Sequence, residues 1–511
     1  MASVRGHRRD SAPPRATMLL ALVAVCALLL GACAPESIAP NRARPSAALA
    51  VLPLTMPAAN PDTRWFSDGI SRELIGALGR NPGLRVTAWH AAQHFRAGAR
   101  DPAITAEELH VASLLRGTLL AQGDQIVLFA ELADARSGRD IWSRSCSGTL
   151  AALAALESRV ARDVGIALHA GPGPAYATPK VDPKAHELVL RARAMLWSAH
   201  DANEAAAARQ IAAKAVALDP GYAEAHAVLA QSWMSIVLNQ PSTLRQASAL
   251  PNARAEAEKA LALDPDNVDA LYALGNVDLN SSEPAQARSE YARAIALDPS
   301  DADAHVALGD LATNLEAMRD EFAAATQLDP FDATAQNNLA DVWFDLGRYR
   351  QALRPATAYV GLRPDSVDAA YLLALTDALL HQDRDAAKAF DIAPPRSLPA
   401  RQLIDAGKLA YQSKLRPALR AQAIAAIAAA ARWSNPDAGF AADLLQAELV
   451  VGENAAVLAR LPRLCADTPI ACADLGSFPL WLPLHGNPRF EALVKKYDTM
   501  SQPHASAPSS R

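Results

Sequence analysis

The stretch VDALYALGNVDLNSSEPAQARSEYARAIALDP, residues 268–299, decides the fold. Its two halves predict two amphipathic helices joined by a turn. In each half the apolar and small residues recur at spacings of three and four, as on one face of a 3.6-residue helix: Leu271, Leu274, Gly275, Ala287, Tyr291 and Ala294. Proline lacks an N–H and biases the residue before it away from the helical region, so the second helix is expected to end before Pro299.

These residues resemble the tetratricopeptide repeat (TPR), a helix-turn-helix unit of about 34 residues. A single unit cannot bury its own apolar face, so the resemblance implies neighbouring units. Further copies are expected at Ala223–Pro265, Ala302–Pro330, Ala333–Pro364 and from Val367 to Pro395. The phrase ALDP or a close variant ends units at 217–220, 262–265, 296–299 and 327–330. In the first of these copies an insertion, roughly Ile236–Leu250, is expected in a loop.

The N-terminus predicts a secretory signal over residues 1–32. Four arginines precede an apolar run, Met18–Leu30, which is shorter than the roughly 20 residues that span a membrane comfortably. Leu30-Gly31-Ala32-Cys33 resembles a bacterial lipobox, which implies lipidation of Cys33 and, with Ala34 next, the outer membrane. An ordinary signal peptide and an uncleaved inner-membrane anchor stay open as alternatives. Residues 33–46 predict a proline-rich tether and residues 499–511 a disordered tail.

The net charge of the chain and the positions of its cysteines are consistent with export from the cytoplasm. The chain has 49 basic and 54 acidic residues, a formal net charge of −5, and no basic stripe, which argues against nucleic acid as a partner. Cys465 and Cys472 lie close enough in CADTPIAC to form a disulfide in an oxidising compartment. Their spacing does not match a C-x-x-C redox pair, and no histidine cluster joins them for zinc. Cys146 is expected as a half-buried strand residue.

Residues 47–170 predict a separate module in the order β-α-β-α-β-β-β-α. Two tight turns, at Gly123-Asp124 and Ser137-Gly138, join its last three strands into an antiparallel meander. Its second helix is expected at Thr105–Ala112, with Thr105 and Glu108 spaced as a capping box. The fold class predicted for the whole chain is therefore an α+β module followed by an all-α TPR solenoid.

This module carries a second resemblance, on VLPL, FSDGISRELIGALGRNPGLRV, LLRGTL and ELADARSGRDIWS. These segments look like the small α/β module related to the N-terminal domain of TolB. That module, followed by TPRs, occurs in the C-terminal halves of CadC-like regulators and of some class III adenylate cyclases. The tail PLWLPLHGNPRFEALVKKY resembles the way those chains end. Here the signal sequence is expected in place of a cyclase domain or winged helix, so the output of those relatives is not carried over.

The predicted boundaries follow from these patterns. A linker is expected at 171–184, the TPR array at 185–395, and degenerate helical repeats with a cap at 396–498.

A search for catalytic motifs returns no nucleophile elbow, H-E-x-x-H, phosphate-cradling glycine loop or C-x-x-C. His90 and His94 share a spacing of four, but no third metal ligand accompanies them. No cofactor, metal site or catalytic residue is predicted.

The candidate site is the face lined by the first helix of each repeat. Polar and apolar residues that alternate there suit an extended or helical peptide: Gln231, Met234, Tyr272, Asn276, Val306, Asp310, Asn337, Asp341 and Phe344. Asn276 and Asn338 lack the basic neighbours that TPRs use to clamp a terminal carboxylate, so a neutral or basic partner is favoured.

The sequence thus predicts a non-catalytic scaffold on the periplasmic side of the bacterial envelope, which binds a protein or peptide partner and is tethered by lipid. A sensory or regulatory ectodomain is the first alternative. An enzyme with an unrecognised site between module and array is the second, and it would require a closed pocket with perturbed titratable groups.

Overall fold

We describe a computed structural model of the chain. It describes residues 47–57, 64–96, 101–123, 125–174, 181–199, 201–238, 243–433, 438–472, 475–476 and 478–497, all within one compact unit that begins at Ser46. The predicted signal, Cys33, the tether and the tail lie outside these residues.

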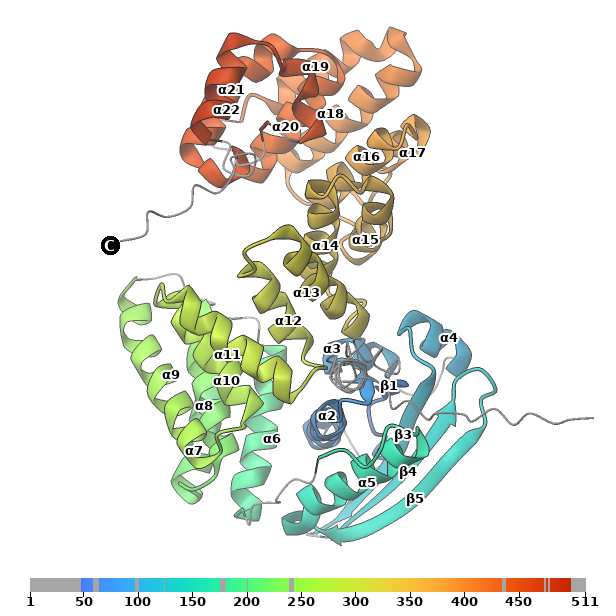
Figure 1. Ribbon diagram of the computed structural model, residues 1–511, viewed down its shortest axis with the longest axis vertical. Coiled ribbons are helices and arrows are strands. Elements are labelled where there is room, and N and C mark those ends of the chain that lie inside the picture. The colour runs from blue at the N-terminus through green and yellow to red at the C-terminus, as the bar shows by residue number, and fades with distance from the viewer. Residues whose placement is uncertain are drawn as a thin grey trace, which may run out of the picture. The chain divides into compact units, whose positions relative to one another are not determined.

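The first part of the described chain is a mixed sheet with helices on it (Figure 1). Strand order is β2-β1-β3-β4-β5: β1 pairs in parallel with β2 and β3, and β3, β4 and β5 form the predicted antiparallel meander. The elements are β1 (Ala47–Val51), α2 (Arg64–Gly79), β2 (Leu84–Val86), α3 (Trp89–Ala92), α4 (Pro102–Glu108), β3 (Ser113–Gln122), β4 (Gln125–Asp134), β5 (Asp140–Thr149) and α5 (Leu153–Ala167).

The core of the module lies between one face of the sheet and the helices α2 and α5. Alternate residues of the central strands, such as Leu119 and Leu128, meet Leu74 of α2 and Val160 of α5 there, and all four are fully buried. Cys146 of β5 is 5% exposed in the same core. The capping-box prediction is wrong: α4 begins earlier, at Pro102, because the Asp101 side chain accepts the N–H of Ala103 as its cap.

The rest of the described chain consists of helices that follow one another in pairs (Figure 1). Their bounds are α6 (Pro183–Ser198), α7 (Ala202–Leu218), α8 (Ala223–Leu238), α9 (Thr243–Leu263), α10 (Val268–Asn280), α11 (Pro284–Leu297), α12 (Ala302–Asp310), α13 (Leu315–Leu328), α14 (Ala333–Asp345), α15 (Tyr349–Leu362), α16 (Val367–Leu379), α17 (Asp383–Lys388), α18 (Leu398–Leu415), α19 (Arg420–Ala430), α20 (Ala438–Val450), α21 (Asn454–Asp467) and α22 (Pro488–Tyr497). The predicted fold class, an α+β module and a TPR solenoid, is confirmed.

Glycine lets the two helices of a unit approach closely. A Cβ built on Gly275 of α10 would lie 2.6 Å from a ring carbon of Tyr291 in α11, and one on Gly309 would lie 2.6 Å from Phe322 in α13. A larger residue at either position would push the aromatic ring out of its place in the core. The small residues that the sequence placed at helix crossings are therefore required by this packing.

The Asp-Pro turns end one helix and cap the next. The Asp298 carboxylate accepts the N–H of Ser300, and the Asp301 side chain then caps α12 by accepting the N–H of Ala304. The same arrangement recurs at Asp329 and Asp332 before α14. Both halves of the turn therefore use short acidic side chains to satisfy backbone N–H groups at the helix start.

The predicted loop insertion in the repeat of α8 and α9 is wrong in part. The extra residues lengthen the helices, since α8 continues to Leu238 and α9 begins at Thr243. Ile236 and Val237 are buried, so the apolar face of α8 extends into the start of the insertion.

Candidate functional site

The nine residues predicted to line the first-helix face do not form one open groove. Met234 and Phe344 are each only 2% exposed, so neither side chain lines an open groove in this structure. Met234 packs with Ala253 of α9 and with Val277 of α10.

Gln231, Tyr272 and Asn276 belong to internal networks. The Gln231 side chain donates to Asp269 Oδ1 at 3.1 Å. The Tyr291 hydroxyl donates to Asn276 Oδ1 at 2.9 Å, and the rings of Tyr272 and Tyr291 lie 5.7 Å apart. Burial, followed by the charges of Asp303 and Asp301, raises the pKa of Tyr272 well above its ordinary value. These side chains stiffen the array as much as they line a surface.

The middle of the face is polar and open. Asp310 and Asp341 are exposed, and Asn337 and Asn338 are partly so. Asn338 of α14 donates to Asp310 of α12 at 3.1 Å, and Asn337 donates to Asp341 at 3.1 Å along α14. Val306 is half-buried against the neighbouring apolar cluster. These contacts join the α12 and α14 surfaces into one ridge of amides and carboxylates.

The α/β module packs on the array through its outer strand. The backbone N–H of Val86 in β2 donates to Ser300 Oγ at 3.0 Å, and that of Ala88 donates to the carbonyl of Leu328 at 2.9 Å. Arg85 donates to the carbonyl of Gln327 at 2.7 Å. Two Asp-Pro turns of the array thus cover the β2 edge of the sheet, which would otherwise present unpaired backbone groups.

His90 and His94, weighed as a metal pair, lie at this contact. His90 Nδ1 is 3.4 Å from the Asp329 carboxylate, and the His94 ring lies 5.0 Å from the ring of Phe331. The Asp329 carboxylate accepts a hydrogen bond from the His90 imidazole, and this bond is the largest of the effects that raise the pKa of His90. Within the described ranges, no three His, Cys, Asp or Glu side chains converge as a metal site would require.

A buried charge network joins α2 of the module to α6, α8 and α10 of the array. Its centre is Arg193, whose side chain is 4% exposed and pairs with Glu73 at 3.9 Å, with Asp269 at 2.7 Å, and with Glu224. Arg72 reaches Asp269 at 3.7 Å. We call Glu73, Glu157, His186, Arg193, Glu224 and Asp269 the Arg193 cluster.

The cluster holds titratable groups with shifted pKa values. Burial, then the nearby Glu73 charge, raises the pKa of Glu157 well above its ordinary range. Burial would lower the pKa of His186, but the Glu73 carboxylate 3.4 Å away outweighs it and the pKa is raised. The charged side chains of the cluster pair with one another, so we interpret the cluster as a structural contact that holds the module on the array.

Acidic residues of one Asp-Pro turn are also perturbed. Burial raises the pKa of Asp298 to about 6. Burial, then the charges of Asp303 and Asp298, raises the pKa of Asp301 to about 7. These residues lie beside the Gly79 end of α2, where a Cβ would come within 2.4 Å of the Asp298 carboxylate.

At the other end of the array the chain covers the first-helix face itself. Phe344 packs with Leu375 of α16 and with Phe478 and Leu480, which come from the segment after the last repeat pair. The rings of Phe344 and Phe478 lie 5.9 Å apart. The predicted site residue Phe344 is therefore buried by a part of the same chain, which no local sequence pattern indicated.

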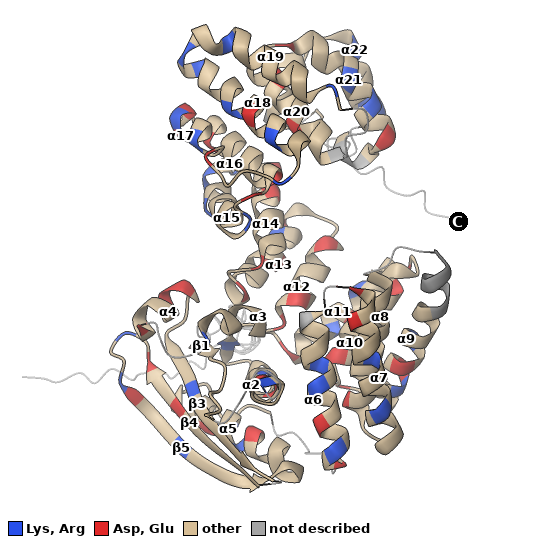
Figure 2. Ribbon diagram, turned by 180° about the vertical axis from the view of Figure 1, so that it is seen from behind, with Lys and Arg blue, Asp and Glu red and all other residues tan. Residues whose placement is uncertain are grey.

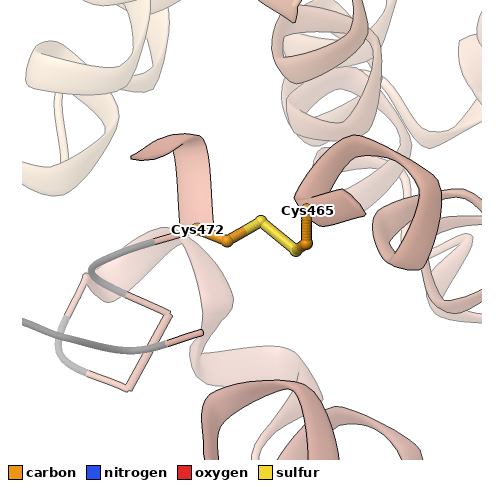
Figure 3. The surroundings of a disulfide bond; sticks show 2 residues. All are labelled: Cys465 and Cys472. Atoms are coloured by element: carbon orange, nitrogen blue, oxygen red, sulfur yellow. A yellow bond between two sulfur atoms is a disulfide. The ribbon is translucent and has the colours of Figure 1, made fainter. Parts of the chain in front are cut away.

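Cys465 of α21 and Cys472 form a disulfide in the structure, shown in Figure 3. Both cysteines are fully buried, in a cluster with Leu461, Trp481 and Phe490. We call this cluster, centred on the disulfide, the terminal cluster. It holds the chain just before the segment that covers Phe344.

Basic and acidic residues are interspersed over the repeat helices, as Figure 2 shows. In the part of the chain that the structure describes, no helix combines the length and apolar character that crossing a membrane requires.

Comparison with known proteins gives partial matches. No protein-family model matches the chain. A protein of Rhizobium meliloti (strain 1021) described as "Putative adenylate cyclase 3" is 28% identical over 242 residues, which cover 45% of this chain and 40% of that protein. The chain therefore spans well under half the length of this relative.

The solved structures that are similar to this chain include TPR proteins. PilF of Pseudomonas aeruginosa matches 40% of this chain and 89% of its own, at 17% identity and a TM-score of 0.34. YrrB, described as a TPR protein with an unusual peptide-binding site, matches 35% and 89%, at 22% identity and a TM-score of 0.29. We draw nothing about function from similarities of this size.

Proposed function

We propose that the protein is a non-catalytic scaffold on the periplasmic side of the bacterial envelope. We propose further that lipid at Cys33 tethers it, as an outer-membrane lipoprotein. It would bind protein partners through the first-helix face of its TPR array. The observation that carries this proposal is the open ridge on α12 and α14, formed by Asp310, Asn338, Asn337 and Asp341. Its exposed carboxylates and amides favour a neutral or basic partner segment.

The perturbed groups of the Arg193 cluster do not favour the enzyme alternative. They lie in a packed contact and are turned toward other protein groups, as in a structural fastening. Perturbed pKa values of this kind arise from ion-pair networks as readily as from catalytic sites.

A photo-crosslinking amino acid tests the binding face in cells. Placed at Asp310 or Asp341, it should yield one discrete crosslinked partner. Placed at Arg350, an exposed residue of the second helix α15, it should not. Equal crosslinking from all three positions would contradict a specific binding face.

Intact mass and membrane fractionation of the wild type beside Cys33→Ala test the tether. A lipid-bearing chain that starts at Cys33, and a variant that loses the lipid, would support the envelope lipoprotein. A wild type that retains residues 1–32 in the inner membrane would favour the anchored alternative.

A sensory or regulatory role is the second candidate, favoured by the partial match to a protein named as an adenylate cyclase and by the resemblance of residues 47–170 to TolB-like modules of CadC-like regulators. It predicts that a transmembrane signalling protein co-purifies with the chain. Crosslinks confined to soluble envelope proteins would count against it.

A further inference from the structure

The segment Phe478–Leu484, sequence FPLWLPL, lies across the last first-helix surfaces of the array; we call it the C-terminal segment. Phe478 and Leu480 pack on the apolar side chains of α14 and α16. Trp481 and Leu484 instead pack into the terminal cluster. Leu482 is 65% exposed, so neighbouring residues of the segment face different surroundings.

The surface beneath Phe478 belongs to the first-helix face. Asn337, Asp341 and Phe344 are spaced by four and then three, which places them on one stripe of α14. Asn337 is partly exposed and Asp341 is exposed, yet Phe344 is 2% exposed. Since the three share a stripe, the burial of Phe344 reflects the side chains packed on it, among them the Tyr349 ring at 5.8 Å and the Phe478 ring at 5.9 Å.

The neighbouring helix completes an apolar patch. Leu372, Leu375 and Leu379 of α16 recur at spacings of three and four and pack in the same cluster as Phe344 and Tyr349. Leu372 and Leu379 stay half-buried with the segment in place. The polar ridge of α12 and α14 thus continues into an apolar patch, which we define as Phe344, Tyr349, Leu372, Leu375 and Leu379.

The occupant has the chemistry of a peptide ligand. The C-terminal segment carries no charged residue, and it forms a short 3-10 turn with prolines at both ends, Pro479 and Pro483. Proline restricts the free segment, so less conformational entropy is lost when it docks. Its anchors are an aromatic ring and a leucine two residues later.

We propose that the apolar patch is a binding site for uncharged partner segments of the form aromatic-proline-leucine, and that Phe478–Leu480 fills it in cis until such a partner competes. This inference rests on the proposed function and names the chemistry of the partner. The polar ridge beside the patch would then hold the polar or basic flank of the same partner.

Fluorescence anisotropy of a labelled peptide tests the proposal on the full chain. The probe is SFPLWLPLHG, the sequence of residues 477–486, and the control peptide is SAPAWLPLHG. The test variant is Phe478→Gly/Pro479→Ser/Leu480→Gly, which removes both anchors and loosens the backbone. The matched control is Leu482→Gly, because this side chain is exposed on the same segment.

The triple variant should bind the probe at least about tenfold more tightly than the wild type, because a segment in cis competes at an effective concentration of the order of millimolar. The Leu482→Gly variant should resemble the wild type, and the control peptide should bind neither. Adding Leu379→Glu to the triple variant should abolish binding, since it places a charge in the patch.

Hydrogen exchange of the wild type keeps the proposal testable if the triple variant does not fold. About 1 mM probe peptide should speed exchange of the Leu480–Leu484 amides, and the control peptide should not. No probe binding to a folded triple variant, equal binding of both peptides, or unchanged exchange in the wild type would overturn the proposal. If that occurs while crosslinks from Asp341 persist, the scaffold function stands and only this inference fails.

Discussion

The α/β module and the C-terminal segment pack on the same repeat array, but only the module contact contains a buried charge network. The module contact combines apolar packing, such as Leu190 of α6 in the core of the module, with charge, since Arg193 is buried among carboxylates. The turn at Asp298 covers the edge of β2. The C-terminal contact uses apolar side chains, with Phe478 on Phe344 and Leu375. The array therefore has a contact with a buried charge network near its start and an apolar contact near its end.

The difference in chemistry predicts that one contact is permanent and that the other can be exchanged. A buried ion network holds only with every partner in place, because the removal of one charge leaves the others buried and unpaired. Apolar burial is non-directional and roughly proportional to area, so another apolar segment can replace the first at little cost. We therefore expect the module contact to be fixed and the C-terminal contact to be exchangeable.

Arg193→Met should have the largest effect and would break the charged side of the comparison. It removes the cation that Glu73, Glu224 and Asp269 share, which should lower the free energy of unfolding by about 3–5 kcal/mol. Urea unfolding followed by hydrogen exchange in α2 measures this change.

Arg116→Met is the matched control for that prediction. Arg116 also pairs with two carboxylates, Glu131 and Asp140, but its side chain is 42% exposed. Water screens these pairs, so we expect a loss within about 1 kcal/mol. Equal losses for the two variants would show that burial of the Arg193 cluster does not matter.

Loss of the disulfide should come next and tests the apolar side. Cys465→Ala/Cys472→Ala should destabilise the terminal cluster by about 2–4 kcal/mol, because the link restricts the unfolded chain. Hydrogen exchange of α21 and α22 should rise while α2 stays protected. Reductant should speed this exchange in the wild type but not in the double variant, and an equal response of both would show that the Cys465–Cys472 bond is not its cause.

Gly275→Ala tests the packing between the two contacts. The added Cβ would meet the Tyr291 ring, so we expect a loss of about 1–3 kcal/mol in urea unfolding. Gly361→Ala, with open space at its Cβ, should be neutral or stabilising by up to about 1 kcal/mol. Since Asp269 lies on α10, the first variant should also loosen the module contact, and protection of α22 should not change.

A change of pH should have the smallest effect on stability, and this effect should come from the module contact, which contains titratable groups. The pKa values of Asp301 and Asp298 are raised to about 7 and about 6, above the ordinary 3.8, so the folded state binds protons that the unfolded chain releases. Their contribution to stability is therefore lost as pH rises from about 4 to about 7. The raised pKa values of His186 and His90 act in the same direction above their ordinary 6.5.

We thus expect a melting temperature a few degrees higher at pH 6 than at pH 8. Asp301→Asn keeps a good helix cap and should raise the value at pH 8, which shrinks the difference. Asp182→Asn, at the exposed cap of α6, should leave the difference unchanged. If the difference in melting temperature between pH 6 and pH 8 is unchanged in Asp301→Asn, the titrating groups lie outside this turn.

Local sequence patterns were enough to predict the elements and their class. The spacing of Gly275, Tyr291 and Ala294 predicts a helix pair because a single helical face repeats every 3.6 residues, whatever lies beyond it. The recurring Asp-Pro phrase predicts where helices end, since proline acts on its own neighbours. The two turns of the meander follow from the same local chemistry.

The candidate site needed tertiary structure. Gln231 and Met234 both look like groove residues in the sequence, and only the tertiary packing shows that Met234 is buried against Ala253 of α9. Phe344 lies on the predicted stripe, and Phe478, more than a hundred residues later in the chain, belongs to the cluster that buries it.

The sequence by itself thus determined the helical repeats, the mixed sheet and the helix ends, because each depends on residues within one or two turns of each other. Only the tertiary structure decided that Arg193 meets Glu73 and Asp269, and that the chain covers part of its own repeat surface. Burial and charge pairing join residues far apart in the chain, and no local period encodes which distant surface a side chain will meet.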